Sequence, residues 1–215
     1  MNVKKHLNLN ENKFQQIENG VDVNYYHSAI PYAKDKFFSN NDFILIQVSS
    51  FRWQKDQKTL IESLQYLPDN IKLLLVGDGP LIDDSKKLVE KLNLTGRVKF
   101  LGNRYDVPQL LNTTDVVVLS SRHEGLSLSN IEGMSVGKPF IGSNVPGLRE
   151  IVKGYGLLFE QGNDKELAEL IMSLYTNPKL YKKIADQCFE RAKEFDINKM
   201  VDQYVELYKE IININ

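Results

Sequence analysis

The chain has 215 residues, of which 42% are hydrophobic, and its 27 basic and 28 acidic residues leave a formal net charge of -1. This length allows one large α/β domain or two small ones with a substantial core, and the balanced charge offers no electrostatic attraction for nucleic acid or for an anionic membrane. The N-terminus lacks the apolar stretch of a secretory signal and no apolar run reaches about 18 residues, so we expect a soluble, cytoplasmic protein.

The first 20 residues are polar and lead into ENGVD at residues 18–22. We interpret residues 1–20 as a connector and residues 21–215 as the folded domain. Five short apolar runs follow, and each is continuous rather than alternating, which is typical of strands buried on both faces. They are FILIQV (43–48), IKLLLV (71–76), RVKFL (97–101), DVVVLS (115–120) and KPFIGS (138–143).

Helical patterns lie between the apolar runs. DQKTLIESLQYL (56–67) and LIDDSKKLVEKL (81–92) place apolar residues three and four apart, as amphipathic helices do. The alternation of strand and helix predicts an α/β fold with a Rossmann-like, doubly wound parallel sheet and right-handed crossovers. Ligands of such sheets bind beyond the carboxyl ends of the strands, so the loops after the runs are where a site is expected.

The chain after Gly162 predicts three consecutive C-terminal helices. NDKELAELIMSLYTN (163–177), PKLYKKIADQCFERAKEF (178–195) and DINKMVDQYVELYKEII (196–212) each open with Asn, Pro or Asp, which favour a helix start. Cys188 lies in the second, where we expect a buried or incidental thiol rather than a nucleophile. In the third, one apolar face is expected to pack in the core: Ile197, Met200, Val201, Tyr204, Val205, Tyr208 and Ile211.

The loop after the first apolar run is basic. SSFRWQKDQK (49–58) brings Arg52, Lys55 and Lys58 to the carboxyl end of a strand. Basic side chains in this position neutralise a pyrophosphate and an oxyanion leaving group. A solvated helix start explains the same residues equally well.

The next two loops carry weaker signals. GDGP (77–80) is a tight turn without a complete GxGxxG pattern, so a structural role is favoured. GNRYDVPQLL (102–111) brings Asn103 and Arg104 to the rim, where irregular backbone can read the edge of a base. Residues 106–108 are expected to begin a helix.

HEGLSLSNIEG (123–133), after the fourth run, is the strongest signal. Gly125 allows the backbone to approach a ligand closely. The amides of Gly125, Leu126, Ser127 and Leu128 lead into a helix whose N-terminus favours negative charge, which makes a site for a diphosphate.

Two glutamates bracket this stretch. Glu132 can accept hydrogen bonds from the vicinal hydroxyls of a ribose, although Ser129 and Glu132 also match the S-x-x-E capping box, which needs no ligand. Glu124 precedes Gly125 at an open strand end, where a structural carboxylate gains little. The spacing therefore predicts one carboxylate in the loop and one on the helix.

The loop after the fifth run, NVPGLREIV (144–152), places Pro146 and Gly147 where they would border the same crevice, and Glu150 either caps or pairs with Arg149. No metal site is predicted. The sequence has no Asp-x-Asp, and the histidines are too scattered to suggest one: His6, His27 and His123.

Taken in order, these blocks resemble the C-terminal, donor-binding domain of retaining GT-B glycosyltransferases of family 4, the glycosyltransferase group 1 set. The resemblance runs from about residue 19 to the final helix. It is specific because Glu124 and Glu132 have the E-x7-E spacing of that family, in order with five other blocks: ENGVD, VSSFRWQKDQKTLIESL, LLLVGDGP, RVKFLGNRYDVPQLL and GLLFEQGNDKELAELI.

The resemblance implies a role for each loop. Glu124 would contact the transferred sugar, Glu132 would hold the ribose, and Lys55 would stabilise the leaving phosphate. The amides of residues 126–128 would hold the diphosphate, and the backbone around Asn103 and Arg104 would border the base. The family arginine five or six residues before the lysine is absent, since Ser50 stands there, and Arg52 is the candidate to compensate.

The same resemblance implies a retaining hexosyl transfer from a nucleoside diphosphate sugar to a hydroxyl acceptor, in polysaccharide or glycolipid assembly, with no metal or other cofactor. The resemblance further implies that the acceptor binds to the N-terminal domain of a GT-B enzyme, which we expect to be missing from this sequence. We therefore expect turnover to require that domain, and any peripheral membrane association to be made by the full-length protein. Two other hypotheses remain: a nucleotide-sugar epimerase of GT-B fold, and a non-catalytic nucleotide-sugar binding module.

Overall fold

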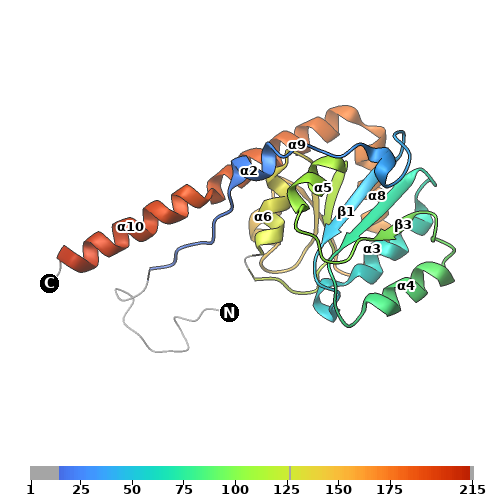
Figure 1. The fold of residues 1–215 in the computed structure, drawn as a ribbon, viewed down its shortest axis with the longest axis horizontal. Helices are drawn as coiled ribbons and strands as arrows, with labels where there is room; N and C mark the ends of the chain where they lie inside the picture. Colours follow the sequence, from blue (N-terminus) through green and yellow to red (C-terminus); the bar gives the residue numbers. More distant parts are fainter. Residues whose placement is uncertain (1–14, 126, 214–215) are drawn as a thin grey trace.

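The sheet at the centre of the fold is parallel and six-stranded, in the order β3-β2-β1-β4-β5-β6. The structure is a computed structural model that describes residues 15–125 and 127–213 (Figure 1). This order confirms the predicted Rossmann-like, doubly wound fold. The strands are β1 (Phe43–Val48), β2 (Ile71–Val76), β3 (Val98–Phe100), β4 (Val116–Leu119), β5 (Phe140–Ser143) and β6 (Leu157–Phe159).

The five predicted strands are confirmed. The residues of β1, β2, β4 and β5 are largely buried between two layers of helices, whereas in β3 only Val98 is buried. In the middle of the sheet, Leu45 of β1 pairs with Leu73 of β2 and Val116 of β4, and all three side chains are fully buried. The sequence analysis missed β6, whose three residues are too few to show a period.

Helices cover both faces of the sheet (Figure 1). On one face, α3 (Gln57–Ser63) packs against α4 (Ile82–Lys91) and α8 (Asp164–Thr176). On the other, α2 (Val23–His27) packs against α5 (Val107–Thr113) and α6 (Leu128–Ser135), and α9 (Pro178–Ala192) lies beside α6. Shorter segments are α7 (Arg149–Val152) and the 3-10 turns η2 (Lys34–Lys36), η3 (Trp53–Lys55), η4 (Leu64–Tyr66) and η5 (Lys193–Phe195).

The predicted C-terminal helices are confirmed, and their starts follow from local capping. The Asn163 side chain accepts from the Glu166 amide at 3.2 Å at the start of α8, and Asn177 accepts from the Leu180 amide at 3.0 Å at the start of α9. Each bond satisfies an amide that the helix itself leaves without a partner. In α9, burial raises the pKa of the Cys188 thiol to about 12, as expected for a packed rather than a nucleophilic cysteine.

The last helix, α10 (Ile197–Asn213), projects away from the body of the domain (Figure 1). Its helical period was predicted correctly, but the expected core packing of its apolar face is wrong. Val201, Val205 and Tyr208 are 47%, 42% and 60% exposed. The period of a helix shows which face is apolar, whereas it does not show what covers that face.

Residues 15–20 run beside the start of α10 (Figure 1). The backbone of Val21 pairs with Phe195 and Ile197, at N–O distances of 2.9 and 3.0 Å, and the Gly20 amide donates to the Met200 sulfur at 3.3 Å. Residues 1–14 lie outside the described part of the chain. The predicted connector and domain boundary therefore stay predictions.

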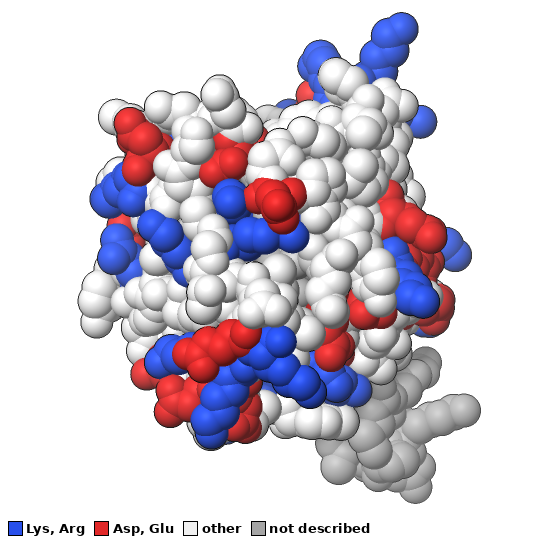
Figure 2. Space-filling view, turned by 90° about the vertical axis from the view of Figure 1, so that its right-hand side faces the viewer, with Lys and Arg blue, Asp and Glu red and all other residues white. Residues whose placement is uncertain are grey.

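Basic and acidic side chains are intermixed on the face shown in Figure 2. This arrangement agrees with the near balance of 27 basic and 28 acidic residues. Within residues 15–125 and 127–213, none of the helices combines the length and the apolar character needed to cross a bilayer.

Candidate functional site

The sheet has its topological switch point between β1 and β4. The chain moves outward from β1 to β2 and β3, and returns to the other side of β1 with β4. Doubly wound folds bind ligands in a crevice at such a switch point, beyond the carboxyl ends of the two strands.

Lys55 and Glu124 meet at this crevice. The Lys55 Nζ lies 2.5 Å from Glu124 Oε1, and the Ser121 hydroxyl donates to the same oxygen at 2.6 Å. The Glu124 side chain is 6% exposed and that of Lys55 is 23% exposed. The structure thus brings together two predicted site residues that are 69 positions apart in the sequence.

This ion pair corrects one argument made from the sequence. A carboxylate at Glu124 was expected to gain little in a structural role, whereas the structure gives it a lysine and a hydroxyl donor. Ser121 was not predicted, and only its position at the end of the fourth apolar run indicated that it lay near the site.

The N-terminus of α6 opens toward the same loop. Ser127 is the N-cap residue and makes no side-chain capping bond, and Leu128 begins the helix with a 42% exposed side chain. Gly125 is exposed, with open space where a Cβ would stand. Leu126 lies outside the described residues. The described geometry leaves the start of this helix accessible to a bound anion.

The capping-box alternative for Glu132 is wrong. Because α6 begins at Leu128, both Ser129 and Glu132 lie inside the helix rather than at its N-cap and third positions. Glu132 is half-buried beside α2, and burial raises the pKa of its carboxyl, while the hydrogen bond with Tyr26 opposes that shift. The prediction that one carboxylate lies in the loop and the other on the helix is confirmed, because Glu124 precedes α6 and Glu132 lies within it.

The loop after β5 closes one side of the crevice. Gly147 has φ +89°, and a Cβ on it would stand 2.4 Å from the carbonyl oxygens of Glu124 and Gly125. The backbones of the two loops therefore touch, as predicted. Glu150 accepts from the Gly147 amide at 2.5 Å, and Arg149 bonds to Asn144 instead of Glu150.

The other basic residues of the loop after β1 lie apart from the Lys55–Glu124 pair. Arg52 is exposed and lines a hollow of about 330 Å³ with Trp53 and Arg122. Lys58 is 65% exposed and lies 3.7 Å from Glu62 within α3, which fits the solvated helix start.

The loop after β3 is held by its own ion pair. Arg104 binds Asp106 with both Nε and Nη2, at 2.8 and 2.6 Å, and Asp106 also accepts from the Tyr32 hydroxyl at 2.6 Å. These donors keep the pKa of the Asp106 carboxyl well below its ordinary value. Asn103 is exposed at the rim. The helix expected from residue 106 is confirmed as α5, with Asp106 as its N-cap.

GDGP supports the site rather than forming it. Gly77 has φ +124°, and a Cβ there would stand 2.2 Å from the Ser49 carbonyl oxygen. The Phe51 amide donates to the Asp78 carbonyl at 3.0 Å. This turn therefore packs directly against the loop that carries Lys55.

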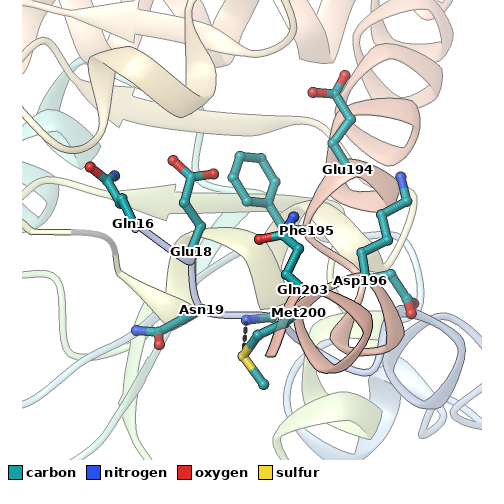
Figure 3. Close-up of a pocket in the computed structure, with 10 residues that line it drawn as sticks. Gln16, Glu18, Asn19, Glu194, Phe195, Asp196, Met200 and Gln203 are labelled. Atoms are coloured by element: carbon teal, nitrogen blue, oxygen red, sulfur yellow. Dashed lines mark hydrogen bonds between the residues drawn. The ribbon is translucent and has the colours of Figure 1, made fainter. Parts of the chain in front are cut away.

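A separate hollow of about 260 Å³ lies between residues 16–20 and the start of α10 (Figure 3). Glu18, Glu194, Asp196 and Met200 are among its lining residues. It contains none of the predicted site residues. Among the residues that the structure describes, no group of three His, Cys, Asp or Glu side chains is placed to hold a metal ion.

The chain is similar in sequence to known glycosyltransferases. The sequence pattern of the family described as "Glycosyl transferases group 1" matches residues 31–191. The chain is 30% identical over 205 residues to N-acetyl-alpha-D-glucosaminyl L-malate synthase of Bacillus anthracis, covering 92% of this chain and 54% of that protein. It is 31% identical to an Escherichia coli UDP-Gal:alpha-D-GlcNAc-diphosphoundecaprenol alpha-1,3-galactosyltransferase, covering 97% and 57%.

A solved structure shares the fold. The crystal structure of Anabaena HepE in complex with UDP-glucose superposes with a TM-score of 0.85 at 29% identity, covering 91% of this chain and 57% of that one. The same Anabaena protein has also been solved with UDP, and with UDP and glucose. The chain thus spans about half the length of the curated relatives it matches.

Proposed function

The chain belongs to the glycosyl transferases group 1 family, and on that premise we propose that it is the part of a retaining glycosyltransferase, of family 4, that binds the nucleoside diphosphate sugar. The observation that carries the proposal is the Lys55–Glu124 pair, 2.5 Å apart at the switch point beside the open start of α6. This arrangement offers a cation and helix amides to a diphosphate and a carboxylate to a sugar.

UDP is the nucleotide that we propose. HepE has been solved with UDP and with UDP-glucose, and the name of the Escherichia coli relative specifies a UDP-sugar. Glu132 would accept hydrogen bonds from the ribose hydroxyls, and the backbone at Asn103 and Arg104 would border the base.

In this proposal the Lys55 ammonium exchanges its ion pair with Glu124 for one with the bound diphosphate. The lysine is already beside the crevice, so a phosphate oxygen replaces the carboxylate as its partner, and the amides of residues 126–128 hold the remaining charge. Glu124 is then free to accept hydrogen bonds from the transferred sugar. Such fixed dipoles and cations stabilise a leaving diphosphate without reorganisation.

Transfer breaks the bond between the anomeric carbon and the diphosphate oxygen and forms one to the acceptor oxygen on the same face of the sugar. The acceptor proton passes to the leaving diphosphate, and no metal ion takes part. The acceptor would bind to a second domain, in polysaccharide or glycolipid assembly in the cytoplasm, with any peripheral membrane contact made by the whole protein. Arg52 would assist the phosphates by moving inward from its exposed position.

Calorimetric titration of the chain with UDP, GDP, ADP and their sugar conjugates tests the proposal. We expect UDP to bind, and Glu132→Ala to weaken UDP binding by about 10- to 100-fold, because two hydrogen bonds to a charged group are lost. The matched control is Glu169→Ala, at an exposed position on α8. Absence of binding by every nucleotide at millimolar concentration, or equal effects of the two variants, would contradict the proposal.

A further inference from the structure

We propose that Asp56 and Arg122 are a positioning pair that holds Lys55 against Glu124. This inference rests on the proposed function for the role of Lys55, but the pair itself is not part of that proposal. Asp56 directly follows Lys55, and Arg122 lies two residues before Glu124, so the pair joins the two loops whose side chains meet in the crevice.

The backbone of Asp56 has an uncommon conformation. Its φ and ψ are 45° and 46°, in the left-handed region that a residue with a Cβ rarely adopts. Although Asp56 is the N-cap residue of α3, its side chain makes no capping bond. Residues with such uncommon conformations persist where the surrounding structure holds them, and they are often found at functional sites.

The Asp56 carboxylate is where those surroundings act. It is 2% exposed and accepts from Arg122 Nη2 at 2.8 Å, from the Thr59 hydroxyl at 2.8 Å and from Gln161 at 3.1 Å. These donors come from the loop after β4, from α3 and from the loop after β6. One buried carboxylate therefore connects three elements at the carboxyl edge of the sheet.

Arg122 contacts the turn on both sides of Lys55. Its backbone amide donates to the Gln54 carbonyl at 2.8 Å, and its guanidinium binds Asp56. The guanidinium also lies 5.4 Å from the centre of the Trp53 ring, a cation–π contact. Arg122 thus contacts residues 53, 54 and 56, which are the neighbours of Lys55 on both sides in the sequence.

Gln47 of β1 and Ser120, which directly follows β4, also bond to this turn. Gln47 donates to the Lys55 carbonyl at 3.0 Å, and the Ser120 hydroxyl donates to the Asp56 carbonyl at 2.8 Å. With its backbone held in this way, only the side-chain torsions of Lys55 remain to be ordered. Fixing a reacting group through its neighbours in this manner reduces the entropy lost when the ligand binds.

The first test uses Asp56→Asn, because Asn has nearly the same shape, tolerates the left-handed region and lacks the charge that Arg122 binds. We expect UDP affinity to fall by about 10- to 100-fold, as for a misplaced binding group. In a Lys55→Met background the same substitution is expected to have no further effect. Equal losses in both backgrounds would show a merely structural role and overturn the inference.

The matched control is Asp69→Asn, which also removes an aspartate that is paired with an arginine. The Asp69 side chain is 98% exposed, and its partner is Arg97, which is not part of the site. Its UDP affinity is expected to equal that of the wild type. Arg122→Lys provides a second variant should Asp56→Asn not fold, and it is expected to reproduce the loss of affinity and its dependence on Lys55.

The second test needs no ligand. The coupling between Lys55 and Glu124 is measured by urea unfolding of Lys55→Met, Glu124→Gln and the double variant, in the wild type and in Asp56→Asn. We expect the coupling to be lost in the Asp56→Asn background, and unchanged coupling would overturn the inference. If the wild type binds no nucleotide, the proposed function fails while this cycle still decides the positioning role.

Discussion

At the scale of single residues, the site consists of contacts that are made in the absence of ligand. The Glu124 carboxylate is buried, and the Lys55 ammonium and the Ser121 hydroxyl hold it in place. A buried charge with a partner is tolerated, whereas the same charge without one is costly. Contacts within the protein therefore hold the Lys55 and Glu124 side chains together at the carboxyl edge of the sheet.

Gly147 tests whether the contact between loops matters for this geometry. We expect Gly147→Ala to lower the free energy of unfolding by about 2–4 kcal/mol, because a Cβ would collide with the backbone of Glu124 and Gly125 in addition to straining its own backbone. It should also weaken UDP binding. Urea unfolding and calorimetry measure the two effects.

Gly154→Ala is the control for that prediction. Gly154 also has φ +89°, but a Cβ there meets nothing within 4 Å. It is expected to cost only the backbone strain, about 1 kcal/mol, and to leave UDP binding unchanged. Equal changes in the free energy of unfolding at the two positions would show that the contact with Glu124 does not contribute to stability.

Glu132 predicts a pH dependence. Its pKa is raised above the ordinary value of 4.5 because burial disfavours the charge. A raised pKa means that the folded chain holds the proton more tightly than the unfolded chain. The resulting stability is complete below the unfolded pKa and is lost as pH rises through the folded pKa.

UDP binding should change with pH in the opposite direction, because the ribose hydroxyls donate to the charged carboxylate. We expect affinity to fall as the pH is lowered from neutral through the raised pKa of Glu132. Calorimetry across this range measures the profile. Glu132→Gln should lack this part of the dependence, which separates it from titration of the UDP phosphates, and identical profiles would contradict the assignment.

At the scale of elements, α6 and α10 show how differently two helices obtain their roles. The loop that follows β4 leads into α6, whose N-cap residue Ser127 makes no side-chain capping bond. The helix α10 extends from the body, and only its first residues are bonded to residues 20 and 21. On its apolar face, Val201, Val205 and Tyr208 are exposed, although the pattern is that of a packed helix.

The exposure of α10 predicts that its apolar residues contribute little to stability. Val205→Ala should change the free energy of unfolding by less than about 0.5 kcal/mol. Val118→Ala, in the fully buried strand β4, should cost about 2 kcal/mol because it leaves a cavity. Urea unfolding of both variants measures the difference, and a cost at Val205 equal to that at Val118 would show that α10 packs on the domain.

At the scale of the whole molecule, the proposed function requires positive potential at the site without a metal ion. Among the described residues no cluster of three metal-ligating side chains is present, and we propose that Lys55 and the start of α6 supply the positive potential. We therefore expect UDP affinity in EDTA and in Mg²⁺ to agree within about a factor of two. A drop of tenfold or more on chelation would contradict the proposed metal-free site, and Lys55→Met should bind weakly under both conditions.

Much of the fold could be predicted because burial leaves a local trace in the sequence. FILIQV and IKLLLV are continuous apolar runs and form β1 and β2 over the predicted residues. The three residues of β6 are too short for such a trace, and its place at the sheet edge follows from pairing with β5. The loops of the site were predicted from their positions after strands, and Glu124, Lys55 and Gly147 all lie at the crevice.

The contacts within the site could not be predicted in the same way. Asp56 and Arg122 are 66 positions apart, and their opposite charges do not distinguish this pair from the many others that 27 basic and 28 acidic residues allow. The capping box at Ser129 was a correct pattern in the wrong register, since α6 begins one residue before it. The apolar face of α10 was a correct pattern, but Val201, Val205 and Tyr208 on that face are exposed rather than packed in the core.

The sequence by itself determined the order of strands and helices, the parallel sheet and the loops that carry the chemistry, because these follow from periodicity and from residue types a few positions apart. Only the tertiary structure decided which side chains meet, with Lys55 on Glu124 and Asp56 on Arg122, and which apolar face stays exposed. The physical reason is that β1 and β4 become neighbours through strand order, and contacts between their loops depend on packing across the whole sheet.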